Sequence, residues 1–157
     1  MNPLVPRGRV PAVVLKNLLN LWPPYLAAGV HVDYIQRDYS RVHVSMALHW
    51  YNRNYVGTHF GGSLYAMTDP FYMLMLIQLL GPDTIVWDKA ANIRFRRPGK
   101  GRVSALFQIS PHEVAALQTE LARTGRVDFE KTLRVLDADL MTVAEVDKVV
   151  YLKKKTR

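Results

Sequence analysis

The run from Leu64 to Leu80 limits the possible folds more than any other part of this sequence, because it is apolar almost all round a helix. A helix of that kind is buried in a protein core or in a membrane. Asp69-Pro70 interrupts the run and leaves Phe71–Leu80, which is much shorter than the ~20 residues that cross a bilayer. The pattern therefore predicts a long helix at the centre of a protein core.

Segments in which apolar and polar residues alternate lie on both sides of this helix. Alternation with a period of two is typical of strands with one buried face, and the short turns between most of them indicate antiparallel neighbours. A second helix is expected over 111–124, because Ser110, Pro111 and Glu113 have the spacing of a capping box with proline at the first helical position. The expected strands span residues 30–34, 42–48, 84–98, 103–109, 127–135 and 140–152.

This order of elements belongs to the α+β class, with an antiparallel sheet against one long helix. The length of 157 residues favours a single domain over 1–157, in which 1–27 is an N-terminal extension with a helix from Val10 to Trp22 packed on the rest. A helix that is apolar all round needs more cover than one flat sheet. Either the sheet curls around it or a second copy closes over it, so we predict a homo-oligomer, as a dimer or a dimer of dimers.

The composition narrows the classes of function. The chain has no cysteine, which excludes disulfides, thiolate metal sites and a cysteine nucleophile and fits a cytoplasmic protein. The net charge of +8 suits polyanionic partners such as a phosphate-bearing cofactor, although solubility alone explains it equally well. A stacking surface for nucleic acid needs aromatic residues among the basic ones, and only Phe95 stands within 94–102. We therefore expect neither a nucleic-acid nor a membrane partner.

No metal site is expected either. The histidines that come closest to a cluster share one alternating strand face without a carboxylate at ligand-like spacing, so we expect them to be exposed. They are His31, His43 and His49.

Asp69 is the most informative candidate for catalysis. It is the only charged residue between Gly61 and Pro82, and a carboxylate in a core must be paired, hydrated or given a raised pKa. Such perturbed groups are enriched at functional sites. The alternative is that Asp69 caps a helical turn that begins at Pro70, since Asp followed by Pro suits the N-cap and first helical positions.

Gly61 and Gly62 open the predicted helix. Amides at a helix N-terminus can bind a carbonyl oxygen, and glycine allows a substrate close to the backbone, as in an oxyanion hole; an ordinary tight turn is the alternative. In the preceding loop, Asn54 could position water or a carbonyl, and His59 could act as an acid or base near neutral pH. A turn residue and a surface histidine are the alternative explanations for these two.

The sequence NYVGTHFGG at 54–62, followed by Asp69, resembles the hotdog-fold thioesterases of the phenylacetate-pathway type. That pattern has Asn, Gly and His-Gly-Gly, with a catalytic Asp nine residues after the His. The resemblance covers about residues 28 to 153, and the segment VWDKAANIRFRRPGKG is similar to a poorly characterised bacterial branch of the superfamily. It implies a hotdog fold, in which a strongly curved antiparallel sheet wraps a long central helix.

The resemblance also implies an activity, the hydrolysis of an acyl-CoA thioester to a free acid and coenzyme A. Asp69 would activate water or attack directly, across a dimer interface from the Gly61 and Gly62 amides, with Asn54 and His59 nearby. No cofactor is implied beyond the coenzyme A that forms part of the substrate. The residues expected to contact the substrate or its phosphates are Arg94, Arg96, Arg97, Lys100, Phe60 and Met73.

Two positions depart from the family pattern. Phe60 stands where the family has His, with His59 one place earlier, and Met73 stands where related enzymes often have a hydroxyl residue. These departures favour an alternative function, that of a non-catalytic protein that binds acyl-CoA or fatty acyl groups. The presence of Asp69 favours the enzyme.

Overall fold

The computed structural model describes residues 10–155, so the first nine residues of the predicted extension lie outside the described part of the chain. The helices are α1 (Ala12–Asn20), α2 (Pro23–Ala28), α3 (Gly61–Ala66), α4 (Phe71–Leu80) and α5 (Pro111–Thr124). The strands are β1 (Val30–Ile35), β2 (Arg41–Met46), β3 (Thr84–Phe95), β4 (Val103–Gln108), β5 (Arg126–Asp137) and β6 (Thr142–Lys154).

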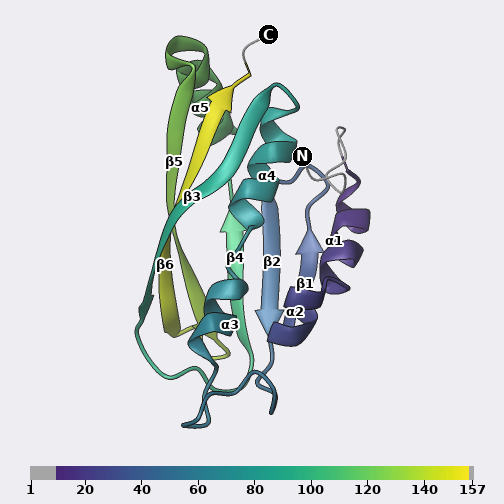
Figure 1. Ribbon diagram of the computed structural model, residues 1–157, viewed down its shortest axis with the longest axis vertical. Coiled ribbons are helices and arrows are strands. Elements are labelled where there is room, and N and C mark those ends of the chain that lie inside the picture. The colour runs from purple at the N-terminus through teal and green to yellow at the C-terminus, as the bar shows by residue number, and fades with distance from the viewer. Residues whose placement is uncertain (1–9, 156–157) are drawn as a thin grey trace.

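The six strands form one antiparallel sheet in the order β1-β2-β4-β5-β6-β3. Figure 1 shows α3 and α4 running along this sheet, with β3 on one side of them and β1 on the other. The predicted α+β architecture, a curved antiparallel sheet around a central helix, is therefore confirmed. The start and end of the second predicted helix are also right, and its capping box from Ser110 to Glu113 is formed.

The central helix is divided into α3 and α4, as the Asp69-Pro70 interruption predicted. Leu64, Phe71 and Leu76 are all buried against the inner face of the sheet, and each apolar side chain of this size contributes about 1.5–3 kcal/mol when fully buried. The ring of Phe71 lies 4.9 Å from that of Phe107 on β4, measured between centroids. This packing fixes the position of the short segment between the two helices.

The N-terminal helices dock on β1. Asn20, the last residue of α1, donates to the main-chain oxygen of Val32 at 3.0 Å and accepts from its amide at 2.7 Å. The helix predicted from Val10 to Trp22 is shorter in the structure, because α1 ends at Asn20. The chain soon returns to a helical conformation, since Pro23 begins α2. Proline is well suited to a first helical position, since its missing amide hydrogen is not needed there.

Strand β3 is at one end of the sheet, so one of its edges has no neighbour among the described strands. Three of its large apolar side chains are substantially exposed, namely Ile85, Trp87 and Phe95. A long and exposed edge strand with apolar side chains is a template for pairing with another chain.

No helix in the described part of the chain is both long enough and apolar enough to cross a membrane.

Candidate active site

The carboxylate of Asp69 lies in the break between α3 and α4, with 42% of its side chain exposed. It does not cap the following helix, because the N-cap of α4 is Pro70 and no side-chain cap bond is formed. Instead, Asp69 Oδ1 accepts a hydrogen bond of 2.9 Å from the ammonium group of Lys148 on β6. The capping alternative is therefore wrong, and Asp69 is half of an ion pair.

Lys148 connects Asp69 to a second carboxylate. Its side chain is only 1% exposed, and its Nζ lies 3.1 Å from Oδ1 of Asp88 on β3. That contact is an ion pair by distance, and Asp88 Oδ1 accepts no hydrogen bond from the described residues. Burial by itself would lower the pKa of Lys148, but the hydrogen bond and charge of Asp69, together with Asp88, outweigh burial and raise it. Lys148 is therefore a buried cation.

Asp88 has an unusual protonation equilibrium for a carboxyl group. Burial and the adjacent Asp69 carboxylate raise the pKa of Asp88 to about 6, while Lys148 acts in the opposite direction. Asp88 lies where the register of β3 with β6 shifts, between 88 and 90. Such bulges re-aim side chains near functional sites. Within the cluster of Asp69, Asp88 and Lys148, Asp88 is therefore a group that can change its protonation state near pH 6.

Two tyrosines border this cluster. Tyr25 on α2 is buried, and its hydroxyl donates to the main-chain oxygen of Asp69. Burial, followed by the charges of Asp69 and Asp88, raises the pKa of Tyr25, so this hydroxyl remains neutral and can act as a donor. The ring of Tyr65 on α3 faces the ammonium of Lys148, with 5.7 Å between Nζ and the ring centroid. Helix α2 thus holds the backbone of Asp69 while β6 holds its side chain.

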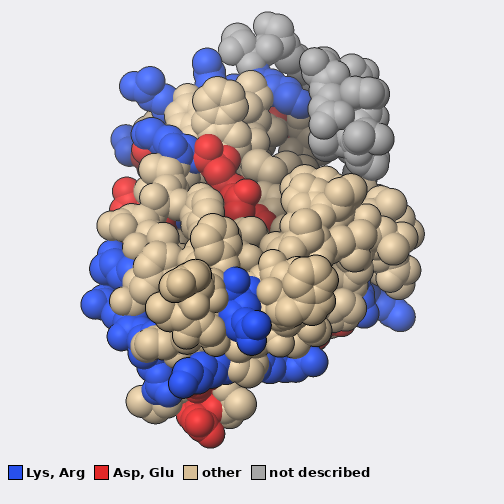
Figure 2. Space-filling model, turned by 60° about the horizontal axis from the view of Figure 1, so that its bottom comes forward, with Lys and Arg blue, Asp and Glu red and all other residues tan. Residues whose placement is uncertain are grey.

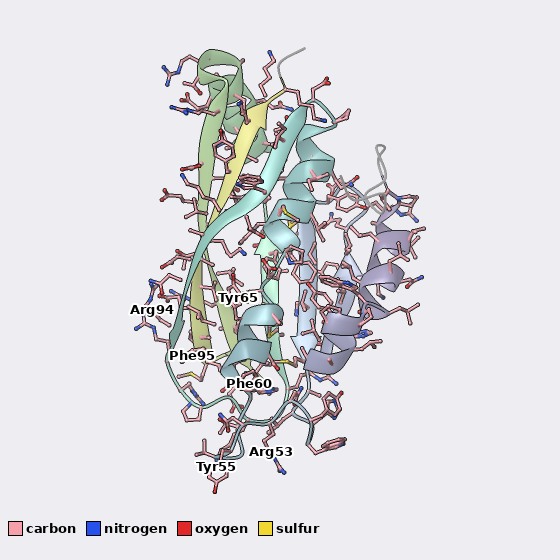
Figure 3. All side chains as sticks on the ribbon, viewed as in Figure 1. Arg53, Tyr55, Phe60, Tyr65, Arg94 and Phe95 are labelled. Atoms are coloured by element: carbon pink, nitrogen blue, oxygen red, sulfur yellow. The ribbon has the colours of Figure 1, made fainter. Side chains whose placement is uncertain are left out.

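Aromatic rings cover the two glycines at the start of α3. A Cβ atom at Gly61 would lie 2.9 Å from the ring of Phe95, and one at Gly62 would lie 2.4 Å from the ring of Phe60. Only glycine leaves room for these rings in this arrangement. Figure 3 shows Phe60 and Phe95 at the same end of α3, with Tyr65 further along the helix. Both phenylalanines are 56% exposed, so an apolar surface adjoins the helix start.

The loop before α3 holds Asn54 and His59 in internal bonds. The Asn54 side chain accepts from the Thr58 amide at 2.9 Å and donates to the Thr58 hydroxyl at 2.9 Å. His59 is 2% exposed, and its Nε2 lies 2.8 Å from the carbonyl oxygen of Gly101. Burial lowers the pKa of His59, and the bond to Gly101 opposes that change. Both side chains stabilise the loop that leads into Gly61.

Most of the predicted phosphate-binding residues have carboxylate partners. Arg94 lies 2.8 Å from Glu145 and 2.5 Å from Asp147, measured between side-chain N and O atoms, and Arg96 lies 3.0 Å from Glu145. Arg97 is paired with Asp137 at 2.9 Å. Lys100 is exposed and has no ion-pair partner within residues 10–155. In Figure 2, most of the visible Lys and Arg side chains lie along the left and lower margins of the molecule.

The structure brings Asp69 together with residues that the sequence did not single out, namely Lys148, Asp88 and Tyr25. It does not place the other candidates around Asp69: Gly61 begins α3 whereas Asp69 lies beyond the end of that helix, and Met73 packs against the core. The position of Lys148 in the sequence could have identified it as a candidate. It lies on the apolar side of the last strand's alternation, where lysine is rare unless it is paired.

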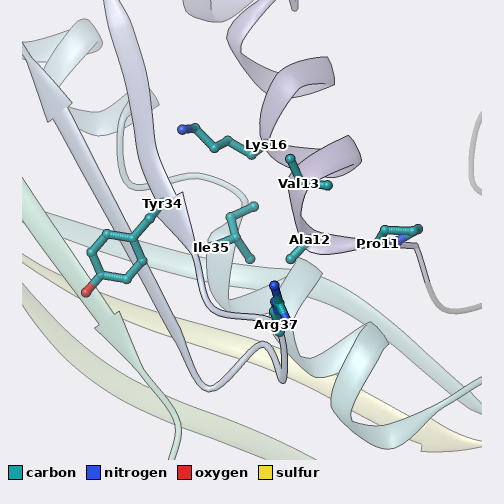
Figure 4. A pocket seen from close by; sticks show the side chains of 7 residues that line it. All are labelled: Pro11, Ala12, Val13, Lys16, Tyr34, Ile35 and Arg37. Atoms are coloured by element: carbon teal, nitrogen blue, oxygen red, sulfur yellow. The ribbon is translucent and has the colours of Figure 1, made fainter.

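Two hollows lie outside this cluster. The first, of about 620 Å³, is formed by α1 and the end of β1, with Lys16 and Arg37 among its lining residues (Figure 4). The second contains Asp33 and His43, which form an ion-pair contact of 2.8 Å that the sequence had not suggested. Neither is lined by Asp69 or Lys148.

Within residues 10–155, no group of three His, Asp or Glu side chains is arranged to hold a metal ion.

Solved structures of the hotdog class share this architecture. A probable thioesterase of unknown function from Pseudomonas aeruginosa superposes with a TM-score of 0.81 at 19% identity, over 94% of this chain and 100% of the other. The thioesterase HI1161 from Haemophilus influenzae gives 0.66 at 11% identity, over 94% of each chain. The Escherichia coli PaaI protein of the phenylacetic acid degradation operon gives 0.56 at 14% identity, over 84% and 83% of the two chains. The fold is therefore a hotdog, as the sequence predicted.

The family can be stated as well. Residues 11–152 match the family described as "Domain of unknown function (DUF4442)", and the chain belongs to that family. No curated protein matches the chain.

Proposed function

We propose that this protein is an acyl-CoA thioesterase. The observation that carries the proposal is the half-exposed carboxylate of Asp69, held at a helix break by a buried lysine. Asp69 occupies the position of the catalytic carboxylate in the thioesterases that the sequence resembles. Named thioesterases among the structural neighbours support the general class of activity.

In the proposed reaction, Asp69 accepts a proton from a water molecule as the water oxygen bonds to the thioester carbonyl carbon. The carbonyl oxygen then carries negative charge, which the backbone amides of Gly61 and Gly62 would stabilise. The tetrahedral species expels the coenzyme A sulfur as a thiolate, which takes the proton held by Asp69 and so restores the carboxylate. The products are a free acid and coenzyme A, and no further cofactor takes part.

A second copy of the chain completes this site in the proposal. Gly61 and Asp69 of one chain lie at opposite ends of α3, so in the proposal a partner chain supplies one of the two groups that act on a single carbonyl. The unpaired edge of β3 offers a surface for this association, because its backbone groups can continue the sheet into a second copy. Asp88 lies on the same strand, so the cluster would be close to the interface.

The substrate-contacting residues follow from the same assignment. Exposed Phe60 would contact the acyl group beside Gly62, and half-buried Met73 would line its apolar end. Of the predicted phosphate-binding residues, Lys100 is the one best placed to bind a phosphate, because no carboxylate of the described residues competes for it. Arg94 and Arg96 would have to exchange Glu145 for a phosphate.

Asn54 and His59 have an indirect role in the proposed mechanism. Their bonds to Thr58 and to Gly101 hold the loop that ends at Gly61, so they would fix the position of the oxyanion donor. His59 would not be the acid or base in this scheme, because it is buried within the loop.

One specific observation favours the second candidate function, a non-catalytic protein that binds acyl groups. Phe60 covers Gly62 and stands where the family has its histidine. In that case the protein would bind acyl-CoA without releasing coenzyme A.

The deciding experiment compares wild type with Asp69→Asn in a thiol-release assay, with acyl-CoA substrates from short to long and aromatic. We expect a loss of at least about 10²-fold in kcat, because the proton acceptor is removed. Asp83→Asn is the matched control, since it makes the same change at an exposed turn and should retain full activity. Binding of each acyl-CoA without hydrolysis by wild type would instead establish the binding protein.

A further inference from the structure

Lys148 is the least expected side chain in the sheet. It occupies one side of β6 together with Val146, Val150 and Leu152, all of them fully buried. A buried ammonium loses its hydration at a cost of several kcal/mol, so it persists only when charged partners and hydrogen bonds compensate. A methionine of similar length would fill the same space without that cost. The presence of a lysine here therefore calls for a reason other than packing.

We propose that Lys148 is a positioning residue for thioester hydrolysis, which holds the Asp69 carboxylate by Oδ1 so that Oδ2 remains free to accept the proton of the attacking water. This inference rests on the proposed function of Asp69 as the group that activates water. Asp88 is the second anchor of the lysine in this arrangement, and it keeps the ammonium from turning away from Asp69.

Contacts with three parts of the fold restrain the ammonium group of Lys148. Asp69, at the α3–α4 break, takes its hydrogen bond at 2.9 Å, and Asp88 on β3 lies 3.1 Å from the same nitrogen. The ring of Tyr65 on α3 faces the ammonium at 5.7 Å from Nζ to the ring centroid. With its position set from three sides, Lys148 can in turn orient Asp69, whose own side chain is half-exposed.

The backbone of Asp69 is fixed independently of its side chain. Tyr25 donates to its carbonyl oxygen, and the Asp69 amide donates to Ala66 at 3.2 Å. The remaining freedom of Asp69 is therefore in the side-chain rotation, which the bond to Lys148 restricts. A misplacement of about 1 Å at a reacting group can lower the rate roughly 10²-fold, so this restriction matters for catalysis.

The charged groups around Lys148 also determine how the cluster responds to pH. Lys131 lies directly opposite on β5, but its ammonium is paired with Glu113 of α5. Because the charge of Lys148 lowers the pKa of Asp88, loss of that charge would move the protonation of Asp88 to higher pH. A protonated Asp88 can share its proton with Asp69, which would then accept one from water less readily.

The test compares Lys148→Met with Lys131→Met by steady-state thioester hydrolysis as a function of pH. Both changes remove an inward-facing lysine that is paired with a carboxylate, but only the first touches Asp69. We expect Lys148→Met to lower kcat about 10²-fold with KM within roughly threefold of wild type. Its acidic limb should also move up by about one pH unit or more. Lys131→Met should keep both the rate and the profile.

Asp88→Asn provides a second variant if Lys148→Met does not fold. It leaves the lysine in place and removes one anchor, so we expect an intermediate loss of about tenfold in kcat and no inflection near pH 6 from this residue. Unchanged kcat and pH profiles in either folded variant would overturn the positioning role.

A titration of ¹³C-labelled aspartate carboxyl groups by NMR, in wild type and Lys148→Met, separates this inference from the proposed function. A higher titration midpoint of Asp88 in the variant would support the coupling between Lys148 and the carboxylates even if wild type released no thiol. In that outcome the catalytic role of Lys148 fails together with the proposed function. An unchanged midpoint would overturn the inference while leaving the activity of wild type intact.

Discussion

The hydroxyl of Tyr25 gives the sharpest test of how the site is held. This group is buried and donates to the main-chain oxygen of Asp69 from a helix 44 residues earlier in the chain. The change Tyr25→Phe removes only the hydroxyl and keeps the ring, which packs 5.8 Å from that of Phe71 between centroids. Because burial raises the pKa of Tyr25, the hydroxyl is a neutral donor at any pH used in an assay.

The expected loss of stability is about 1 kcal/mol, the usual net contribution of a buried hydrogen bond, with up to about 3 kcal/mol if the carbonyl oxygen finds no other donor. For a chain of this length, 1 kcal/mol corresponds to a fall in Tm of roughly 2–4 °C. We also expect kcat to fall severalfold, because the peptide that carries Asp69 loses its anchor to α2.

Tyr39→Phe is the matched control. The Tyr39 side chain is equally buried, and its hydroxyl donates to the main-chain oxygen of Val10 at 2.5 Å, but it does not contact Asp69. Differential scanning calorimetry should show a similar loss of stability in both variants, and thiol release should fall only in Tyr25→Phe. Equal losses of activity in both variants, or no loss in Tyr25→Phe, would refute the role of Tyr25 as an anchor of the site.

Three further outcomes are expected. The pKa of His59 is lowered by burial from its usual 6.5, so the unfolded chain binds more protons below that pH. The free energy of unfolding should therefore decrease as pH falls from 7.5 to 5.5, and urea denaturation should show less of this decrease in His59→Gln. Ser110→Ala removes the capping box of α5 and should lower stability by about 1 kcal/mol with unchanged thiol release. Lys100→Ala should weaken coenzyme A binding in calorimetry more than Arg94→Ala does, because Arg94 is neutralised by two carboxylates, and equal effects would contradict this.

The fold was largely predictable from local patterns. Alternation located the strands to within a few residues, because each has one face in the core, and the Asp69-Pro70 step predicted the break before α4. The order of strands could not be read from these patterns. The separation of β3 from β4, its neighbour along the chain, depends on how the sheet curves around the central helix. The resemblance to hotdog proteins implied the curved sheet around the helix, and the strand order itself was not predicted.

Of the candidate site, only Asp69 could be predicted from the sequence, and the residues around it could not. Asp69 was apparent because a single charge in a long apolar run must be accommodated in some way. Its partner Lys148 is 79 residues further along the chain, and no local pattern connects the two. The phosphate-binding prediction met a related difficulty, because Arg94 and Arg96 alternate along one strand like an exposed basic edge. Their acidic partner Glu145 belongs to the neighbouring strand, and only the register of β3 with β6 brings them together.

Asp69 and Lys148 depend on each other to different degrees, and this difference makes the lysine informative about function. A carboxylate with 42% of its side chain exposed could remain hydrated without any partner, so Asp69 does not need Lys148 in order to be charged. A lysine at 1% exposure cannot do without Asp69 and Asp88. Stability alone would be served as well by apolar side chains at both 148 and 88 and a hydrated Asp69. In the proposed mechanism the lysine adds a fixed direction for one carboxylate oxygen, which packing does not require and which the activation of a water molecule would require.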